Sequence, residues 1–79
     1  MSVTILFFGA AANAVGQRRI ELSLTKGSTA KMVFEQVKDQ FPTLDSHKLL
    51  YSLNQNYASG DEIVLDGDEL AIFTAVSGG

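Results

Sequence analysis

The chain has 79 residues, of which 46% are apolar and 19% charged, and this is the balance of a single folded domain. A domain of this length buries only about 60% of the surface that its unfolded chain would expose, so a deep, enclosed active site is not expected. Its net charge of −3 argues against nucleic acid or an anionic membrane as the main partner, and without cysteine it has no disulfide, zinc–thiolate site or thiol nucleophile.

The first third of the chain predicts an edge hairpin. Residues 3–8 are rich in β-branched and aromatic side chains and end at Gly9, which is typical of a strand. Residues 10–15 are expected to form a short helical turn closed by Gly16, and residues 18–24 alternate as a second strand. The residues expected to face the core from these strands are Val3, Ile5, Phe7, Ile20, Leu22 and Leu24.

A single main helix is predicted next, running to about Gln40. Ser28 or Thr29 can accept a backbone N–H and cap its first turn. Pro42 is expected to end the helix, because the residue before a proline is disfavoured in the α region. The apolar residues that recur at helical spacing are Ala30, Val33, Phe34, Val37 and Phe41. We therefore expect one stripe of this helix to pack on a sheet.

The second half predicts two more strands. Residues 49–53 are expected to form a short strand followed by a turn at 54–56, and residues 69–75 form the last strand. Residues 63–65 are expected to be a buried apolar plug. The order strand, strand, helix, strand, strand predicts an α+β domain with one main helix on one face of the sheet. If the last strand pairs beside the first, the sheet is mixed, and the architecture resembles the β-grasp of ubiquitin.

Conventional catalytic and metal sites find little support in the residues. The one histidine, His47, lies in a polar connection and is expected to be solvated. The acidic run 61–69 lacks the spacing of a calcium loop and is better explained by turns, and residues 9–16 lack a phosphate-binding pattern. We expect no metal ion and no tightly bound cofactor. The apolar stretch 3–12 is shorter than the ~20 residues of a membrane span, so a cytoplasmic protein without a signal peptide is expected.

The C-terminal Gly78-Gly79 is the candidate reactive segment. A glycine pair can enter a partner's channel where any Cβ would collide. A partner enzyme can join the last carboxylate to AMP as a mixed anhydride, and a sulfur donor or an amine can then displace the AMP. The plain alternative is a frayed end. We divide the chain into a folded domain, 1–75, and a tail, 76–79.

Four apolar residues are expected on the sheet face away from the helix, where a protein that binds nothing would carry polar side chains. Aromatic residues on such a face are typical of a docking surface. The alternative is that a loop covers them. The four residues are Leu6, Phe8, Tyr57 and Phe73.

Four segments, VTILFFGAAANAVG, STAKM, KLLYSLNQNYAS and LDGDELAIFTAVSGG, resemble the small subunit of molybdopterin synthase, the MoaD family of ubiquitin-like sulfur carriers. The resemblance implies that an E1-like adenylyltransferase activates Gly79 with ATP and that a sulfurtransferase converts it to a thiocarboxylate. The tail then enters the large synthase subunit, in an expected heterotetramer, and passes sulfur to cyclic pyranopterin monophosphate. By the same resemblance Val76, Ser77 and Gly78 would thread into the partner, and Phe8, Tyr57 and Phe73 would form its docking platform.

One departure from the family and three alternatives stay open. Members commonly have two prolines where this chain has Thr74-Ala75, which leaves the stiffness of the tail exit in question. A thiamin-pathway sulfur carrier would share the fold and the tail chemistry but use another acceptor. A ubiquitin-like modifier would join Gly79 to lysines of target proteins, and a pure interaction module would not use the tail at all.

Overall fold

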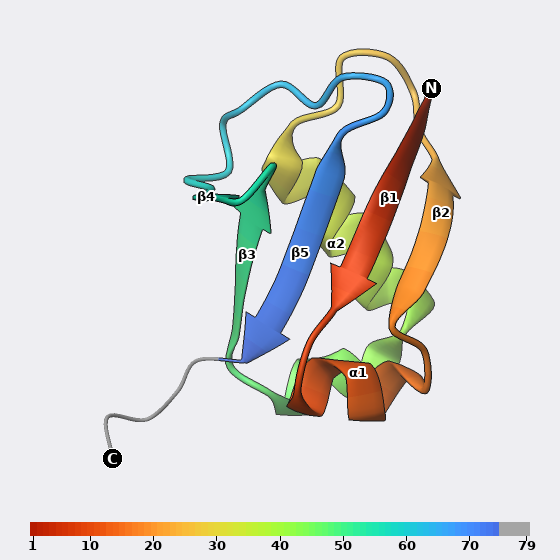
Figure 1. The fold of residues 1–79 in the computed structure, drawn as a ribbon, viewed down its shortest axis with the longest axis vertical. Coiled ribbons are helices and arrows are strands. Elements are labelled where there is room, and N and C mark those ends of the chain that lie inside the picture. The colour runs from red at the N-terminus through yellow and green to blue at the C-terminus, as the bar shows by residue number, and fades with distance from the viewer. Residues whose placement is uncertain (75–79) are drawn as a thin grey trace.

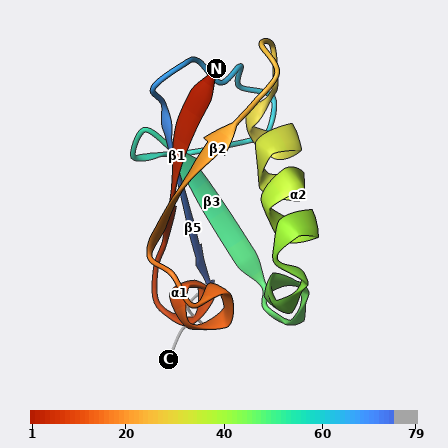
Figure 2. The ribbon, with the colours of Figure 1, turned by 90° about the vertical axis from the view of Figure 1, so that its right-hand side faces the viewer.

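A computed structural model describes residues 1–74 of the chain (Figure 1). It contains one five-stranded sheet in the order β2-β1-β5-β3-β4, with the long helix α2 lying across one face (Figure 2). The strands are β1 (Ser2–Phe7), β2 (Arg19–Ser23), β3 (Leu49–Leu53), β4 (Asn56–Tyr57) and β5 (Glu69–Thr74). The helices are α1 (Ala10–Val15), α2 (Ala30–Gln40) and the 3₁₀ helix η1 (Pro42–Ser46).

The centre of the sheet is a parallel pair formed by its first and last strands. Ile5 of β1 lies opposite Leu70 of β5, and Phe7 lies opposite Ile72. The other neighbours are antiparallel, so the sheet is mixed and the expected pairing of the last strand beside the first is confirmed. The α+β class and the β-grasp arrangement are confirmed as well. Parallel pairing brings the ends of β1 and β5 to the same end of the sheet, which decides where the tail begins.

The core fills the space between the sheet and α2. Ile5, Phe7, Leu70 and Ile72 of the two central strands are almost fully buried. Phe7 also meets the ring of Phe41 edge-on, with centroids 5.8 Å apart. The expected inward residues of the first hairpin are buried, except that Ile20 is half-buried. The helix residues that complete the core are Ala30, Val33 and Val37.

Both ends of α2 follow from local residues. The Thr29 side chain accepts a hydrogen bond from the backbone N–H of Met32 at 3.3 Å, so Thr29 is the N-cap. Ser28 instead donates its hydroxyl to the carbonyl of Thr25 at 2.7 Å. The helix ends before Pro42 as predicted, but Pro42 begins η1, where the sequence had indicated only a polar connection. A 3₁₀ turn there carries Leu44 into the core.

Two expectations for the second half were wrong. Only the middle residue of the 63–65 segment is buried; Ile63 and Leu65 are exposed, because successive side chains of an extended segment point to opposite sides. The turn is also shorter than predicted. Asn54 and Gln55 make the reversal, and Asn56 already pairs with Leu53 in β4. Within the described residues, no helix is long and apolar enough to cross a membrane.

Candidate functional site

The predicted reactive tail follows directly from β5. Gly79 and the three predicted threading residues, Val76, Ser77 and Gly78, lie outside the described residues. The chain reaches them from Thr74 at the end of β5. Phe7 at the end of β1 is the parallel partner of Ile72 in β5. Phe8, which follows β1, therefore lies at the same end of the sheet as the end of β5. The described residues therefore define the end of the sheet at which the tail begins.

The predicted docking residues lie on the sheet face away from α2. Leu6 is the parallel partner of Ala71, and two residues further along β5 is Phe73, which has the same orientation. Phe8 and Tyr57 are 51% and 79% exposed, so no described loop covers them, while Leu6 and Phe73 are half-buried. Within residues 1–74, the alternative that a loop covers the surface is therefore excluded for Phe8 and Tyr57.

A fifth apolar residue of this face was not predicted. Leu50 of β3 pairs with Phe73 and is 42% exposed. Its place on the outer face depends on the register between β3 and β5, which are far apart in the sequence. The alternation of residues 49–53 alone does not say which set faces outward. We call Leu6, Phe8, Leu50, Tyr57 and Phe73 the apolar platform.

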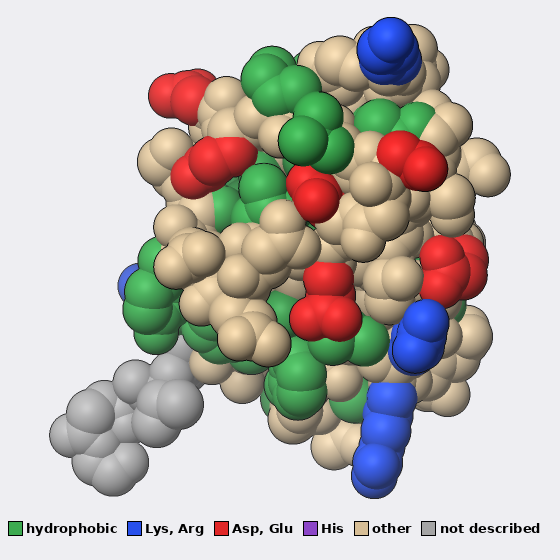
Figure 3. Space-filling model, turned by 45° about the horizontal axis from the view of Figure 1, so that its top comes forward, with side chains coloured by type: hydrophobic (Ala, Val, Ile, Leu, Met, Phe, Trp, Pro, Cys, Tyr) green, Lys and Arg blue, Asp and Glu red, His purple; other side chains and the backbone are tan. Residues whose placement is uncertain are grey.

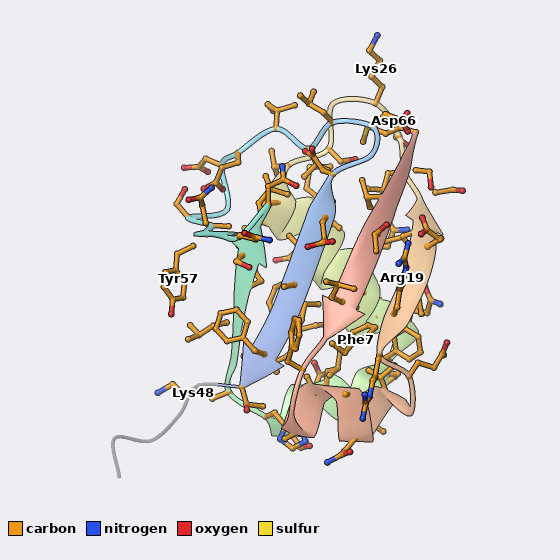
Figure 4. The ribbon with its side chains drawn as sticks, viewed as in Figure 1. Phe7, Arg19, Lys26, Lys48, Tyr57 and Asp66 are labelled. Atoms are coloured by element: carbon orange, nitrogen blue, oxygen red, sulfur yellow. The ribbon has the colours of Figure 1, made fainter. Side chains whose placement is uncertain are left out.

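One side of the platform is built by the β3–β4 hairpin. The rings of Tyr57 and Phe73 lie with their centroids 6.0 Å apart and their planes at 58°. Together with Ser52 and Gln55 they line a cavity of about 240 Å³. Tyr57 projects outward from the free edge of the sheet (Figure 4). The aromatic pair therefore presents an open surface beside a small hollow.

The other side of the platform carries a basic margin. Leu6 and Phe8 line a cavity of about 480 Å³ that is also lined by Ala12 of α1 and by Arg18 and Arg19. Arg19 Nη2 lies 3.3 Å from Glu21 Oε1. Between the two sides of the platform, Leu6 is paired with the small residue Ala71. The arrangement suits a partner that covers the whole face.

The half of the face remote from the tail is polar and acidic. Thr4 donates its hydroxyl to Glu21 at 3.0 Å, and this hydrogen bond, followed by that from Arg19, lowers the pKa of Glu21 below its usual value. Figure 3 shows acidic side chains over the upper and middle parts of the molecule, and hydrophobic side chains both along its lower part and at its top. Leu6 and Tyr57 lie level with Ala71, and Leu50 and Phe73 lie nearer the end of β5, so the apolar platform occupies the half of the sheet face from which the tail leaves.

Asp68 stabilises a turn, as predicted for the acidic residues of the 61–69 region, because it accepts a hydrogen bond from the backbone N–H of Leu65 at 2.8 Å. Asp66 instead accepts one from the backbone N–H of Ser2 at 2.7 Å, which joins this turn to the start of β1. Among residues 1–74 there is no group of three or more side chains placed to hold a metal ion. His47 is half-buried after η1 and makes no side-chain hydrogen bond to the described residues.

Comparison with known sequences extends over the whole chain. Residues 5–79 match the ThiS family. The chain is 30% identical over 81 residues to the molybdopterin synthase sulfur carrier subunit of Arabidopsis thaliana, a match that covers 100% of this chain and 84% of the relative. It is also 30% identical over 83 residues to the subunit of the same name from Chlamydomonas reinhardtii, with 100% of both chains covered.

Solved structures of the same fold include SAMP1 and a chain from a molybdopterin-converting factor. SAMP1 of Haloferax volcanii has a TM-score of 0.88 and 25% identity, with 100% of both chains covered. A chain in the complex of subunits 1 and 2 of the molybdopterin-converting factor from Helicobacter pylori has a TM-score of 0.72 and also covers this chain fully. At 17% identity the second likeness shows the fold alone.

Proposed function

Because the chain belongs to the ThiS family, among the molybdopterin synthase sulfur carrier subunits, we propose that Gly79 carries sulfur as a thiocarboxylate and donates it to cyclic pyranopterin monophosphate. The chain supplies the tail and the docking face, and its partners supply the catalytic groups. One observation carries the proposal: the apolar platform lies at the end of the sheet where β5 leads into the tail. A partner bound to this platform is positioned to receive Gly79.

The loading chemistry needs two steps. A carboxylate oxygen of Gly79 attacks the α-phosphorus of ATP, which releases pyrophosphate and leaves an acyl adenylate. Sulfide delivered by a sulfurtransferase then attacks the acyl carbon and expels AMP, so that a C–S bond replaces a C–O bond. During donation, sulfur leaves for the pterin carbon and an oxygen from water restores the carboxylate. The adenylate serves because a free carboxylate is a poor electrophile and AMP is a good leaving group.

We propose that two kinds of partner use the platform in turn. An E1-like adenylyltransferase would bind it during activation, and the large subunit of molybdopterin synthase would bind it during sulfur donation, in a heterotetramer. The Arabidopsis thaliana and Chlamydomonas reinhardtii relatives, both named molybdopterin synthase sulfur carrier subunits, support the second partner. Both enzymes need access to Gly79, so a single docking face next to the tail serves both. Successive binding follows, because one face cannot hold two partners at once.

Intact-mass spectrometry tests the loading step. The chain is incubated with ATP, a sulfide source and its adenylyltransferase, and a thiocarboxylate adds ~16 Da as sulfur replaces oxygen, a covalent change localised by fragmentation. Gly79→Ala is the matched control, because its added Cβ must enter the partner's channel. A mass gain at Gly79 that is reduced in Gly79→Ala supports the carrier function. An unchanged mass with an active adenylyltransferase contradicts it.

A ubiquitin-like modifier is the second candidate, because SAMP1, which is similar to this chain in sequence and fold, is named a small archaeal modifier protein. The two functions share the acyl adenylate and differ in the nucleophile that follows. An amine of a target lysine would form an isopeptide bond to Gly79, whereas sulfide forms a thiocarboxylate. A ladder of conjugates on a denaturing gel would favour the modifier. Conversion of the pterin by the loaded chain and the large subunit would favour the synthase, and would also exclude a carrier restricted to the thiamin pathway.

A further inference from the structure

The tip of the β3–β4 hairpin has a backbone that its sequence does not favour. Asn54 and Gln55 have φ angles of 49° and 72°, both in the left-handed region. This is the geometry of a two-residue hairpin turn, for which asparagine followed by glycine is the preferred pair. Asparagine tolerates the first position, but glutamine at the second is strained by its Cβ. The fold therefore loses stability at Gln55 that a glycine would restore.

The neighbours of Gln55 hold this strained turn in place. Asn54 donates its side-chain N–H to Asp68 Oδ1 at 3.0 Å and accepts the backbone N–H of Glu69 at 3.0 Å. The backbone N–H of Asn54 also donates to the carbonyl of Glu69 at 2.8 Å. The hairpin is thus fastened to the start of β5 through Asn54. Residue 55 contributes none of these bonds.

The Gln55 side chain is exposed and takes no part in the hydrogen bonds that hold the turn. Its carboxamide makes no hydrogen bond to the described residues, and the polar contacts of the tip all involve Asn54 or Asn56. Gln55 nevertheless lines the cavity of about 240 Å³ together with Tyr57 and Phe73. A strained residue that does nothing for the fold and borders an exposed aromatic pair has the features of a functional position.

The cavity limits what can bind there. Its volume is below the ~300–1,000 Å³ of sites for whole small molecules, so it suits one side chain of a larger partner. Tyr57 and Phe73 offer an apolar wall, while Ser52 and Gln55 offer polar atoms. A carboxamide both donates and accepts, and so it matches a peptide group, which does the same. The hollow is also continuous with the apolar platform through Phe73.

We propose that Gln55 is a binding residue for the large subunit of molybdopterin synthase. Its carboxamide hydrogen-bonds a peptide group of the synthase large subunit, while an apolar side chain of that subunit fills the cavity beside Tyr57. The inference rests on the proposed function, since it takes the large subunit as the occupant. In the proposed complex, the left-handed backbone at residue 55 directs the carboxamide toward the large subunit. The strain of glutamine in this conformation lowers the stability of the free chain.

Three variants separate the side chain from the backbone. Gln55→Gly relieves the strain and removes the carboxamide, so the melting temperature should rise by a few degrees while the Kd for the large subunit rises about five- to tenfold, equivalent to about 1–1.4 kcal/mol. Gln55→Ala keeps the strained backbone, so binding should weaken equally without a gain in melting temperature. Gln55→Asn tolerates the turn and keeps a shorter amide, so it should melt higher and lose less affinity.

Calorimetric titration of the large subunit and thermal melting of the free chain give the two readouts. If Gln55→Gly and Gln55→Ala bind as tightly as the parent, the inference is overturned and the proposed function stands. If Gln55→Gly does not melt higher, the backbone is not strained and the premise is lost. If the parent itself does not bind the large subunit, the proposed function fails and takes this inference with it.

Discussion

Replacing Tyr57 with alanine tests the docking face with little disturbance of the fold. The side chain is 79% exposed, and its main described neighbour is the ring of Phe73, 6.0 Å away between centroids. Since little buried surface is removed, the variant should keep its melting temperature within a few degrees of the parent. Partner binding, in contrast, should fall sharply.

The size of the loss follows from the exposed area. With a tyrosine surface of about 200 Å², the open 79% is about 160 Å², and complete burial at about 25 cal/mol per Å² would contribute about 4 kcal/mol. Ordering the side chain costs about 0.5–1.5 kcal/mol, and part of the ring stays wet. We therefore expect a loss of about 2 kcal/mol, or about 30-fold in Kd.

Calorimetric titration with the synthase large subunit measures this loss. Met32→Ala is the matched control, because Met32 is also an exposed apolar residue, at 56%, but lies on α2 on the opposite layer. The control should bind like the parent. Equal affinities for Tyr57→Ala and the parent, or equal losses for the two variants, would refute a docking face on the sheet.

Three further predictions concern stability. Ile72→Ala, at the buried centre of the sheet, should lower the free energy of unfolding by about 2–5 kcal/mol in urea titrations, and a smaller change would show that the core collapses around the cavity. Gly60→Ala should lower the melting temperature by several degrees, because its Cβ would lie 3.0 Å from the Tyr51 hydroxyl on a backbone with φ of 114°; an unchanged melt would contradict this. Hydrogen bonds from backbone N–H groups, first that of Ser59, lower the pKa of Glu62 below its usual value of 4.5. The ionised carboxylate therefore stabilises the fold above pH 4.5, and this stabilisation is lost as the pH falls through the lowered pKa of the folded state. Glu62→Gln should accordingly melt lower than the parent at pH 7, with the difference closing in acid, and a difference independent of pH would exclude the carboxylate as its cause.

Most of the fold could be predicted because its elements carry periodic patterns. Alternation in residues 18–24 and helical spacing from Ala30 to Phe41 gave the correct elements and inward faces. The two-residue strand β4 and the 3₁₀ helix η1 are too short to show a period. The exposure of Ile63 and Leu65 was missed for a related reason, since a run of three apolar residues does not reveal which of them faces inward.

The candidate site could be predicted in part. Phe8 and Tyr57 were expected on the open face and are exposed there. Leu50 was missed because its orientation depends on the pairing of β3 with β5. The strained backbone of Gln55 was also beyond reach, because an asparagine–glutamine pair is not the usual signature of this turn. Tertiary register and local strain are therefore what the sequence leaves undetermined.

The central position of β5 has a consequence for biosynthesis. The ribosome makes β1 first and β5 last of the five strands, yet the two must lie side by side before the sheet has a middle. Such non-local pairing is slow and leaves the growing chain without the centre of its core until β5 has been made. Phe73 reaches its place next to Tyr57 only at that stage. A product that lacks β5 thus lacks the complete apolar platform, and under the proposed function it would not be bound by the partner enzymes.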